Sequence, residues 1–194
     1  GAYPPGSTFK IVTATAGLEE KKIDGETLIE DPGVITIGPY SYANWLFTKY
    51  GRTEGEINVV RAIKRSTDTF FYKLGEKVGA TRLAEWAKAF GLGRLTEIDL
   101  GTEAAGLVPT PEWKEKITGE RWFLGNTYHL AIGQADLLST PLQINMMSSV
   151  IANQGQLCQP KIARLKEAET PVCQDLKLDQ ETLGLVKNGL KEAC

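Results

Sequence analysis

Residues 3–10 read Tyr-Pro-Pro-Gly-Ser-Thr-Phe-Lys and mark the start of the first predicted helix. The Pro-Pro-Gly stretch at 4–6 cannot lie inside a helix, so it predicts an extended approach that ends in a turn. The sequence then becomes apolar, with no helix breaker before Gly17. We therefore expect a helix from about Ser7 to Glu20, with Ser7 in its first turn.

A serine in the first turn of a helix is well placed to act as a nucleophile. Its hydroxyl lies among backbone N–H groups that lack intrahelical partners, and the positive end of the helix dipole favours negative charge there. Lys10 follows three residues later, so its side chain comes to the same face as Ser7. A lysine can take the serine proton only if burial or nearby positive charge lowers its pKa enough to leave it neutral. The pair is a candidate nucleophile and base, although a serine that merely caps a helix has the same appearance.

The composition limits the classes of protein to which the chain can belong. The chain has 194 residues, a net charge of −2 and 42% hydrophobic residues, which is typical of one globular domain with a proper core. Basic residues do not gather in a run or arm, so nucleic acid is not expected as a partner. No stretch approaches the roughly 18 apolar residues that predict a membrane span.

The three cysteines, Cys158, Cys173 and Cys194, all lie in the last quarter of the chain. Their spacing matches no zinc pattern, and His129 is the only histidine in the sequence, so neither a metal nor another cofactor is expected. A Cys158–Cys173 disulfide is an alternative in an oxidising compartment, but the sequence favours an unpaired structural role for these cysteines.

Periodicity and capping residues predict further elements along the chain. Asn58 can cap a helix, which Ser66-Thr67-Asp68 then interrupts because short polar side chains compete for backbone hydrogen bonds. Thr140 begins a strongly signalled helix with Pro141 at its first position and Gln143 completing a capping box. The remaining expectations are a strand at 34–37, an ordered loop at 40–56, a helix at 80–90 that Gly91 ends, a loop-rich region at 91–138, a strand at 159–165 and a last helix capped by Asp179.

Two short motifs resemble those of a known family. Ser7-Thr8-Phe9-Lys10 and Ser66-Thr67-Asp68 resemble the first two of the three motifs S-x-x-K, S-x-N and K-[ST]-G of serine β-lactamases and penicillin-binding proteins. Tyr42-Ala43-Asn44 imitates a motif of another β-lactamase class but lies too early in the chain, so we interpret it as coincidence. The following stretches also occur in the order and rough spacing of a class B penicillin-binding protein: Phe90-Gly91-Leu92-Gly93, Ile98-Asp99-Leu100, Glu112-Trp113-Lys114, Ile132-Gly133-Gln134 and Thr140-Pro141-Leu142-Gln143.

The resemblance covers essentially the whole chain and implies an α+β fold of the penicillin-binding-protein transpeptidase type. This chain would be mostly the helical portion, with few strands. An aspartate at position 68, followed by Thr-Phe-Phe, resembles the cell-elongation, rod-shape type of these enzymes, whereas division-type enzymes carry asparagine. Asp68 can accept hydrogen bonds but not donate them, so it is expected to hold Lys10.

The activity implied by the resemblance is that of a peptidoglycan D,D-transpeptidase. Ser7 would attack a D-Ala-D-Ala stem peptide, Lys10 would deprotonate Ser7, and Ser66, helped by Asp68, would relay the proton to the leaving group. The oxyanion hole would combine the Ser7 N–H with one from the third-motif strand. β-Lactams would acylate Ser7, a membrane glycosyltransferase of the elongation complex would be a partner, and an N-terminal helix absent from this chain would anchor the protein at the extracytoplasmic face of a bacterial membrane.

The third motif is the main departure from the family pattern. No K-[ST]-G occurs, and Lys116-Ile117-Thr118-Gly119 is near in letters only. We therefore interpret residues 1–194 as a partial transpeptidase domain, from the S-x-x-K helix to just before the expected K-[ST]-G strand, and expect the chain alone to be inactive. The alternatives are a non-catalytic penicillin-binding or sensor module and, less favoured, a serine β-lactamase.

Overall fold

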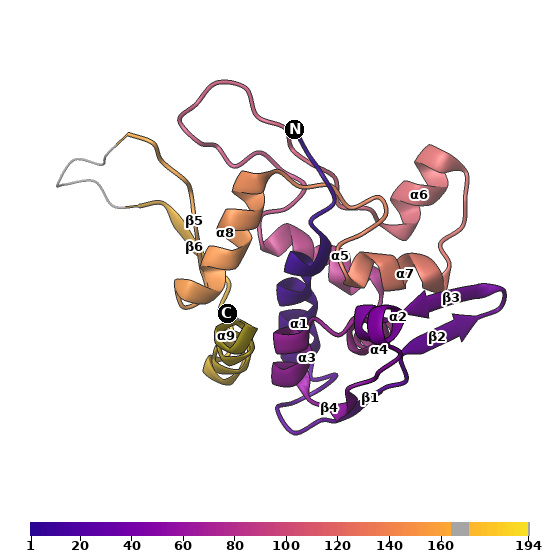
Figure 1. Ribbon diagram of the computed structural model, residues 1–194. Coiled ribbons are helices and arrows are strands. Elements are labelled where there is room, and N and C mark those ends of the chain that lie inside the picture. Colours follow the sequence, from indigo (N-terminus) through magenta and orange to yellow (C-terminus); the bar gives the residue numbers. More distant parts are fainter. Residues whose placement is uncertain (164–170, 194) are drawn as a thin grey trace.

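The computed structural model describes residues 1–163 and 171–193. Helices dominate, and the strands are short (Figure 1). The helical elements are η1 (Gly6–Phe9, a 3-10 turn), α1 (Lys10–Glu19), α2 (Trp45–Tyr50), α3 (Val59–Arg65), α4 (Asp68–Val78), α5 (Ala80–Ala89), α6 (Pro111–Thr118), α7 (Leu124–Ala131), α8 (Pro141–Ala152) and α9 (Gln180–Ala193). The strands are β1 (Ile29–Asp31), β2 (Val34–Ile37), β3 (Tyr40–Ala43), β4 (Gly55–Ile57), β5 (Gln156–Cys158) and β6 (Cys173–Asp175).

Helix α1 is the centre of the molecule. Every residue from Lys10 to Leu18 is buried, and the helix packs against α3, α4, α5 and α9 (Figure 1). Its sequence carries apolar or small residues on all sides, which is the pattern of a helix surrounded by other elements. Lys10, the first residue of this buried helix, has an exposed fraction of 3%.

Close helix contacts at glycines fix the position of α4 on its neighbours. A Cβ atom added to Gly17 of α1 would lie 2.6 Å from a methyl carbon of Leu74 in α4. A Cβ atom on Gly75 would lie 2.5 Å from the Cβ of Ala131 in α7. These two missing side chains let α4 approach α1 on one side and α7 on the other. The first residue of α4 is Asp68, so this packing also places the second motif.

The strands of the described residues form three separate two-stranded antiparallel pairs. Strand β1 pairs with β4, β2 with β3, and β5 with β6. The β2–β3 and β5–β6 pairs lie on opposite sides of the helical body in Figure 1. The prediction of an α+β fold that is mostly helical with few strands is confirmed.

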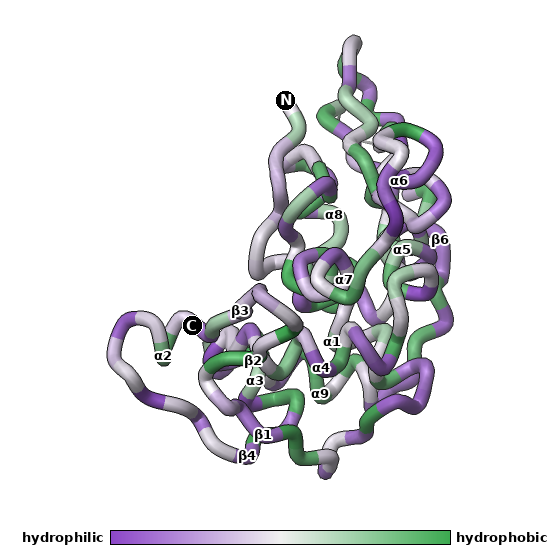
Figure 2. Tube along the Cα trace, turned by 90° about the vertical axis from the view of Figure 1, so that its right-hand side faces the viewer, coloured by the Kyte–Doolittle hydropathy of each residue, from purple (hydrophilic) through white to green (hydrophobic). Residues whose placement is uncertain are grey.

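Polar elements lie at the periphery. Helix α6 carries five exposed residues among its eight and is largely hydrophilic in Figure 2. Within residues 1–163 and 171–193, none of the helices has the length and apolar character needed to cross a bilayer.

Several predicted elements are confirmed. Asn58 Oδ1 accepts a hydrogen bond from Arg61 N and caps α3. The helix that follows is interrupted at Ser66 and Thr67, as expected. Gly91 follows the end of α5 with a φ of +89°, a conformation in which glycine is favoured. Thr140 and Gln143 form the reciprocal capping box of α8.

Other expectations were wrong. The expected loop at 40–56 contains β3, α2 and β4, because residues 40–43 find a partner in β2 across a tight turn. The loop-rich region at 91–138 contains α6 and α7. The start of α6 carries the same signal as α8, since Thr110 accepts from Trp113 N and Pro111 follows it.

The expected helix over 7–20 and strand over 159–165 also need correction. The first turn containing Ser7 is 3-10, and the α-helix begins only at Lys10. The observed strand is Gln156–Cys158, and residues 159–163 are not extended in a sheet. Pro160 has no N–H to donate to a ladder, which explains why pairing does not continue. Positions 164 and 165 lie outside the described residues.

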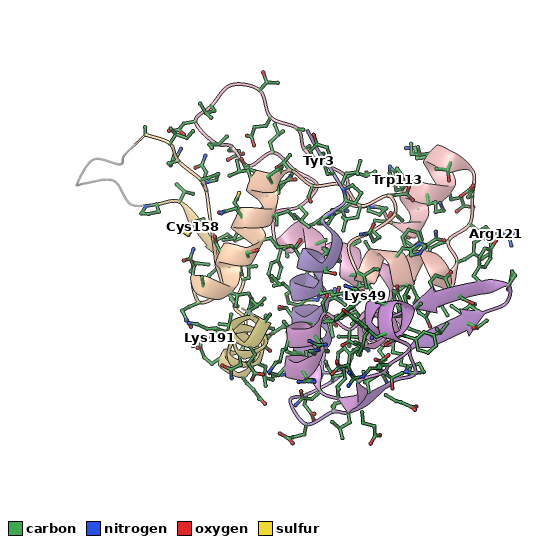
Figure 3. All side chains as sticks on the ribbon, viewed as in Figure 1. Tyr3, Lys49, Trp113, Arg121, Cys158 and Lys191 are labelled. Atoms are coloured by element: carbon green, nitrogen blue, oxygen red, sulfur yellow. A yellow bond between two sulfur atoms is a disulfide. The ribbon has the colours of Figure 1, made fainter. Side chains whose placement is uncertain are left out.

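Cys158 and Cys173 form a disulfide, so the preferred interpretation of unpaired cysteines was wrong. The two residues are directly opposite each other in the β5–β6 ladder, which brings their side chains together. Cys158 is labelled in Figure 3 on this hairpin, beside α8. The spacing of the cysteines did not show that a hairpin joins them.

Candidate active site

The amine of Lys10 is the meeting point of the two motifs. Its Nζ atom donates to the Ser66 carbonyl oxygen at 2.8 Å, to Ser66 Oγ at 2.9 Å and to Asp68 Oδ1 at 2.6 Å. An ammonium group has three donors, and these contacts use all of them. The Phe71 ring covers the group, with its centroid 5.3 Å from Nζ. These contacts hold the Lys10 amine at the turn between α3 and α4.

Burial and charge act on Lys10 in opposite directions. Burial lowers the pKa of its amine, and the charge and hydrogen bond of Asp68 partly oppose this, with a lowered pKa as the result. A lysine can act as a base only in its neutral form, so the enclosure favours the form that a base requires.

Ser66 occupies an unusual backbone conformation in the turn between α3 and α4. Its φ and ψ angles are 52° and 45°, the left-handed region in which helices usually place glycine or asparagine. Such a conformation costs a non-glycine residue on the order of 1–2 kcal/mol. It directs both the carbonyl oxygen and the hydroxyl of Ser66 to the Lys10 amine.

Ser7 is exposed and lies three residues before Lys10, in η1. Gly6 N donates to the Gly133 carbonyl at 2.8 Å, and Tyr3 pairs with Ser139 through two backbone hydrogen bonds of 2.9 Å. A Cβ atom on Gly133 would come within 2.2 Å of the Gly6 carbonyl oxygen, so only glycine permits this backbone contact. The segment before Ser7 is thus fixed to the turn of Ile132-Gly133-Gln134.

A pocket of about 380 Å³ opens beside these groups. Ser7, Lys10 and Ser66 line it together with residues from three other elements. The other lining residues are Thr8, Ile11, Ile63, Ser148 and Leu190. The structure therefore brings the four predicted site residues together: three line one pocket, and Asp68 binds the lysine beneath it.

Two buried polar residues behind the second motif were not predicted. Asn44 is completely buried, and Asp31 is 2% exposed. The Asn44 side chain contacts both Asp31 and the backbone N–H of Asp68. Asp31-Pro32-Gly33 has the composition of a turn, but no local pattern indicates that residues 31, 44 and 68 meet.

In the described part of the chain, no group of three or more His, Cys, Asp or Glu side chains is arranged to hold a metal ion.

Comparison with known proteins gives a family match over almost the whole chain. Residues 1–193 match the family model described as the penicillin binding protein transpeptidase domain. The chain is 36% identical over 173 residues to a protein of Acinetobacter baumannii named peptidoglycan D,D-transpeptidase MrdA; the match covers 88% of this chain and 25% of that protein. The chain thus spans about a quarter of the length of the curated relatives that it matches.

Solved structures show the same likeness. The crystal structure of Pseudomonas aeruginosa PBP2 in complex with WCK 5153 matches with a TM-score of 0.87 and 34% identity, over 99% of this chain and 44% of that one. A structure titled "Structural coordination of polymerization and crosslinking by a peptidoglycan synthase complex" matches with a TM-score of 0.87 and 30% identity, over 99% of this chain and 32% of that one. The fold, the convergent motifs and these matches together show that the chain belongs to the penicillin-binding-protein transpeptidase family.

Proposed function

We propose that the protein is a peptidoglycan D,D-transpeptidase of the cell-elongation type, with Ser7 as its nucleophile. The observation that carries this proposal is the convergence of Ser7, Lys10 and Ser66 on one pocket, with Asp68 hydrogen-bonded to Lys10. Relatives that are 36% identical over 173 aligned residues and 37% identical over 164 are named peptidoglycan D,D-transpeptidases, which supports the same activity.

The first half of the reaction forms an acyl-enzyme. Ser7 Oγ attacks the carbonyl carbon of the penultimate D-alanine in a stem peptide while neutral Lys10 takes the hydroxyl proton. A C–O bond forms to Ser7, and the C–N bond to the terminal D-alanine breaks. The departing amine receives a proton through Ser66 Oγ, which already contacts Lys10 Nζ at 2.9 Å. Asp68 orients Lys10 and stabilises it whenever it carries the proton.

The second half transfers the acyl group. The amine of a neighbouring stem peptide attacks the Ser7 ester, a new amide C–N bond forms, and the C–O bond to Ser7 breaks. Ser66 Oγ accepts the proton that the attacking amine loses and passes its own through Lys10 to Ser7 Oγ, which is the reverse of the first route. A β-lactam would follow the first half only, because its opened ring stays attached and blocks the approaching amine.

The strained backbone of Ser66 supports a functional role for its side chain. Glycine would relieve the left-handed conformation but would remove the hydroxyl that contacts Lys10. Strain of this kind is retained where the local geometry serves function.

The setting of this activity is part of the proposal. Substrates are peptidoglycan stem peptides ending in D-Ala-D-Ala, and the protein works at the extracytoplasmic face of the bacterial envelope, anchored by an N-terminal helix. A membrane glycosyltransferase is the proposed partner, in line with the related complex described as coordinating polymerization and crosslinking. No cofactor takes part.

The test is covalent labelling of the gene's full-length product with a fluorescent penicillin. We expect labelling of the wild type and complete loss in Ser7→Ala. The control variant is Ser149→Ala, whose hydroxyl caps a carbonyl of its own helix and does not line the pocket; it keeps the label. Persistence of the label in Ser7→Ala would refute the assignment of the nucleophile.

The lifetime of the label separates the alternatives. A transpeptidase holds the acyl group for hours and also cross-links stem peptides, whereas a penicillin-binding sensor holds it without cross-linking. A β-lactamase would lose the label within about a second, because rapid hydrolysis of the acyl-enzyme is its function. The partial extent of the domain and the inactivity of the 194-residue chain alone stay predictions; labelling of that chain by penicillin would contradict the second.

A further inference from the structure

We propose that Asn44 and Asp31 are positioning residues that hold the Ser66-Thr67-Asp68 turn from behind, so that its side chains meet Lys10. Neither residue reaches the pocket, and both act through the backbone and side chains of the turn. This inference rests on the proposed function, since it assigns the support of the same site.

The turn is bound on the side away from Lys10 at three points. Trp45 Nε1 donates to the Arg65 carbonyl at 2.9 Å, just before Ser66. The other two points come just after Thr67. Asp68 N donates to Asn44 Oδ1 at 3.3 Å. Thr69 Oγ1 donates to Asp31 Oδ1 at 2.5 Å. The strained Ser66 is therefore fixed on both sides by a segment that lies more than twenty residues earlier.

Asn44 takes the place of a missing helix cap. Thr67 is the N-cap residue of α4, but its side chain makes no capping hydrogen bond. The first N–H groups of a helix have no partner within the helix, and one left buried without an acceptor costs about 1–3 kcal/mol. Asn44 Oδ1 supplies that acceptor to Asp68, the residue whose carboxylate holds Lys10.

Asp31 fixes the orientation of the Asn44 amide. Its carboxylate accepts four hydrogen bonds, with Gly33 N and Thr69 Oγ1 at Oδ1 and with Asn44 Nδ2 and Glu54 N at Oδ2. The opposite orientation of the amide would place two oxygen atoms against each other. The Asn44 N–H₂ group must therefore face Asp31, and its oxygen must face Asp68.

An ion pair between Glu54, the residue before β4, and Arg65 supports the same turn. Glu54, whose backbone N–H binds Asp31, accepts from Arg65 Nε through Oε1 at 2.9 Å. The Arg65 guanidinium lies 5.3 Å from the Trp45 ring centroid. Residues 31, 44, 45 and 54 thus form one support, which we call the rear brace, and every member reaches the turn or a neighbour of it.

The pH dependence of Ser7 acylation tests this role. Of the charged side chains that the structure describes, Asp68 is the one that acts on the Lys10 amine, and Ser66 and Phe71 are its other neighbours. Because Asp68 raises the pKa of Lys10, Asp68→Asn should move the acidic limb of the acylation rate to lower pH by about 1 unit. Loss of the rear brace should loosen Asp68 and move the same limb in the same direction.

The variants are Asn44→Ala and the isosteric Thr69→Val, compared with Thr48→Val in the full-length product. The Thr48 hydroxyl binds the Asn44 carbonyl at 3.2 Å but does not reach the turn, so it is a matched control. We expect Asn44→Ala and Thr69→Val to shift the limb by roughly half as much as Asp68→Asn. The double variant Asn44→Ala/Asp68→Asn should show the same shift as Asp68→Asn alone. Thr48→Val should leave the acidic limb where it is in the wild type.

A second readout does not depend on activity. The ¹³Cε resonance of Lys10, followed against pH in the chain itself, should report a lower pKa in Thr69→Val than in wild type or Thr48→Val. If the wild type takes no penicillin label, the proposed function is overturned. The Lys10 titration alone then decides whether Asn44 and Asp31 position the turn. An unchanged limb and an unchanged Lys10 titration in folded Asn44→Ala or Thr69→Val would overturn the inference, even if both variants melt at lower temperature.

Discussion

Lys10 Nζ and Asp68 Oδ1 lie 2.6 Å apart although the two residues are separated by 58 positions in the sequence. The side chain of Lys10 is 4% exposed and that of Asp68 is 17% exposed, so little water screens the pair. The ion pair joins the start of α1 to the start of α4. It therefore holds two helices together as well as two candidate catalytic groups.

Removal of one partner from this pair should destabilise the fold more than removal of both. Lys10→Met leaves the Asp68 carboxylate without its cation, and we expect the free energy of unfolding to fall by about 2–3 kcal/mol. The double variant Lys10→Met/Asp68→Asn should recover at least half of that loss. Urea unfolding of the two variants and of Asp68→Asn completes the cycle, and strictly additive losses would show that the pair is not coupled.

Two glycine substitutions in helices should have effects of opposite sign. Alanine has the higher helix propensity, so Gly184→Ala in α9, where no atom lies within 4 Å of the new Cβ, should stabilise by about 0.5–1 kcal/mol. In Gly75→Ala the new Cβ would lie 2.5 Å from Ala131 Cβ, so α4 and α7 must separate. We expect a net loss of about 1–3 kcal/mol. Thermal unfolding measures both, and equal shifts would contradict the close approach of α4 and α7.

Reduction of the Cys158–Cys173 disulfide should lower the melting temperature. The bond closes a loop with a sequence separation of 15, for which the chain-entropy model gives about 3 kcal/mol. Thermal unfolding with and without dithiothreitol measures the effect. The double variant Cys158→Ala/Cys173→Ala is the control, since its melting temperature should not respond to the reductant. Equal stability of the wild type under both conditions would count against a structural role for the bond.

The stability of the fold should depend on the ionisation of Asp31 at acid pH. Burial raises the pKa of this carboxyl, but the hydrogen bonds from Thr69, Glu54, Gly33 and Asn44 outweigh burial and hold the pKa below its ordinary value. A carboxyl with a lowered pKa stabilises the fold fully above its ordinary pKa, and this contribution disappears as the pH falls through the folded value.

Comparison with Asp31→Asn isolates this contribution. The amide places an N–H₂ group against backbone or side-chain donors, so we expect a loss of about 1–3 kcal/mol at pH 7. The difference between the variant and the wild type should stay constant down to about pH 4 and narrow below it. Urea unfolding from pH 2 to pH 7 provides the measurement, and a difference that widens toward acid pH would have the wrong sign.

The sequence predicted those features that depend on local chemistry. The capping box at Thr140, the cap at Asn58 and the glycine after α5 each involve residues within a few positions of one another. The family resemblance also connected Ser7, Lys10, Ser66 and Asp68, which the structure brings together, while their catalytic roles stay predictions. Their contact geometry agrees with the expectation that Asp68 holds Lys10.

Features that depend on tertiary pairing could not be predicted. Whether residues 40–43 form a strand depends on β2 being available as a partner, and the disulfide depends on a hairpin that joins residues 158 and 173. Asn44 resembled a chance motif until the fold placed it against Asp31 and Asp68. No local pattern distinguishes such a buried amide from an ordinary loop residue.

The backbone contact between Gly6 and Gly133 bears on when, during synthesis, the Ser7 segment can take up its final position. The Ser7 segment is made before the residues that fix it, because the carbonyl that accepts from Gly6 N belongs to Gly133 and the backbone partner of Tyr3 is Ser139. The Thr13 hydroxyl in α1 likewise donates to the carbonyl of Ala131, a residue that is made much later. Contacts of such long sequence separation form late and slow folding. A nascent chain therefore carries Ser7 without these fixing contacts until residues 131–139 have been made.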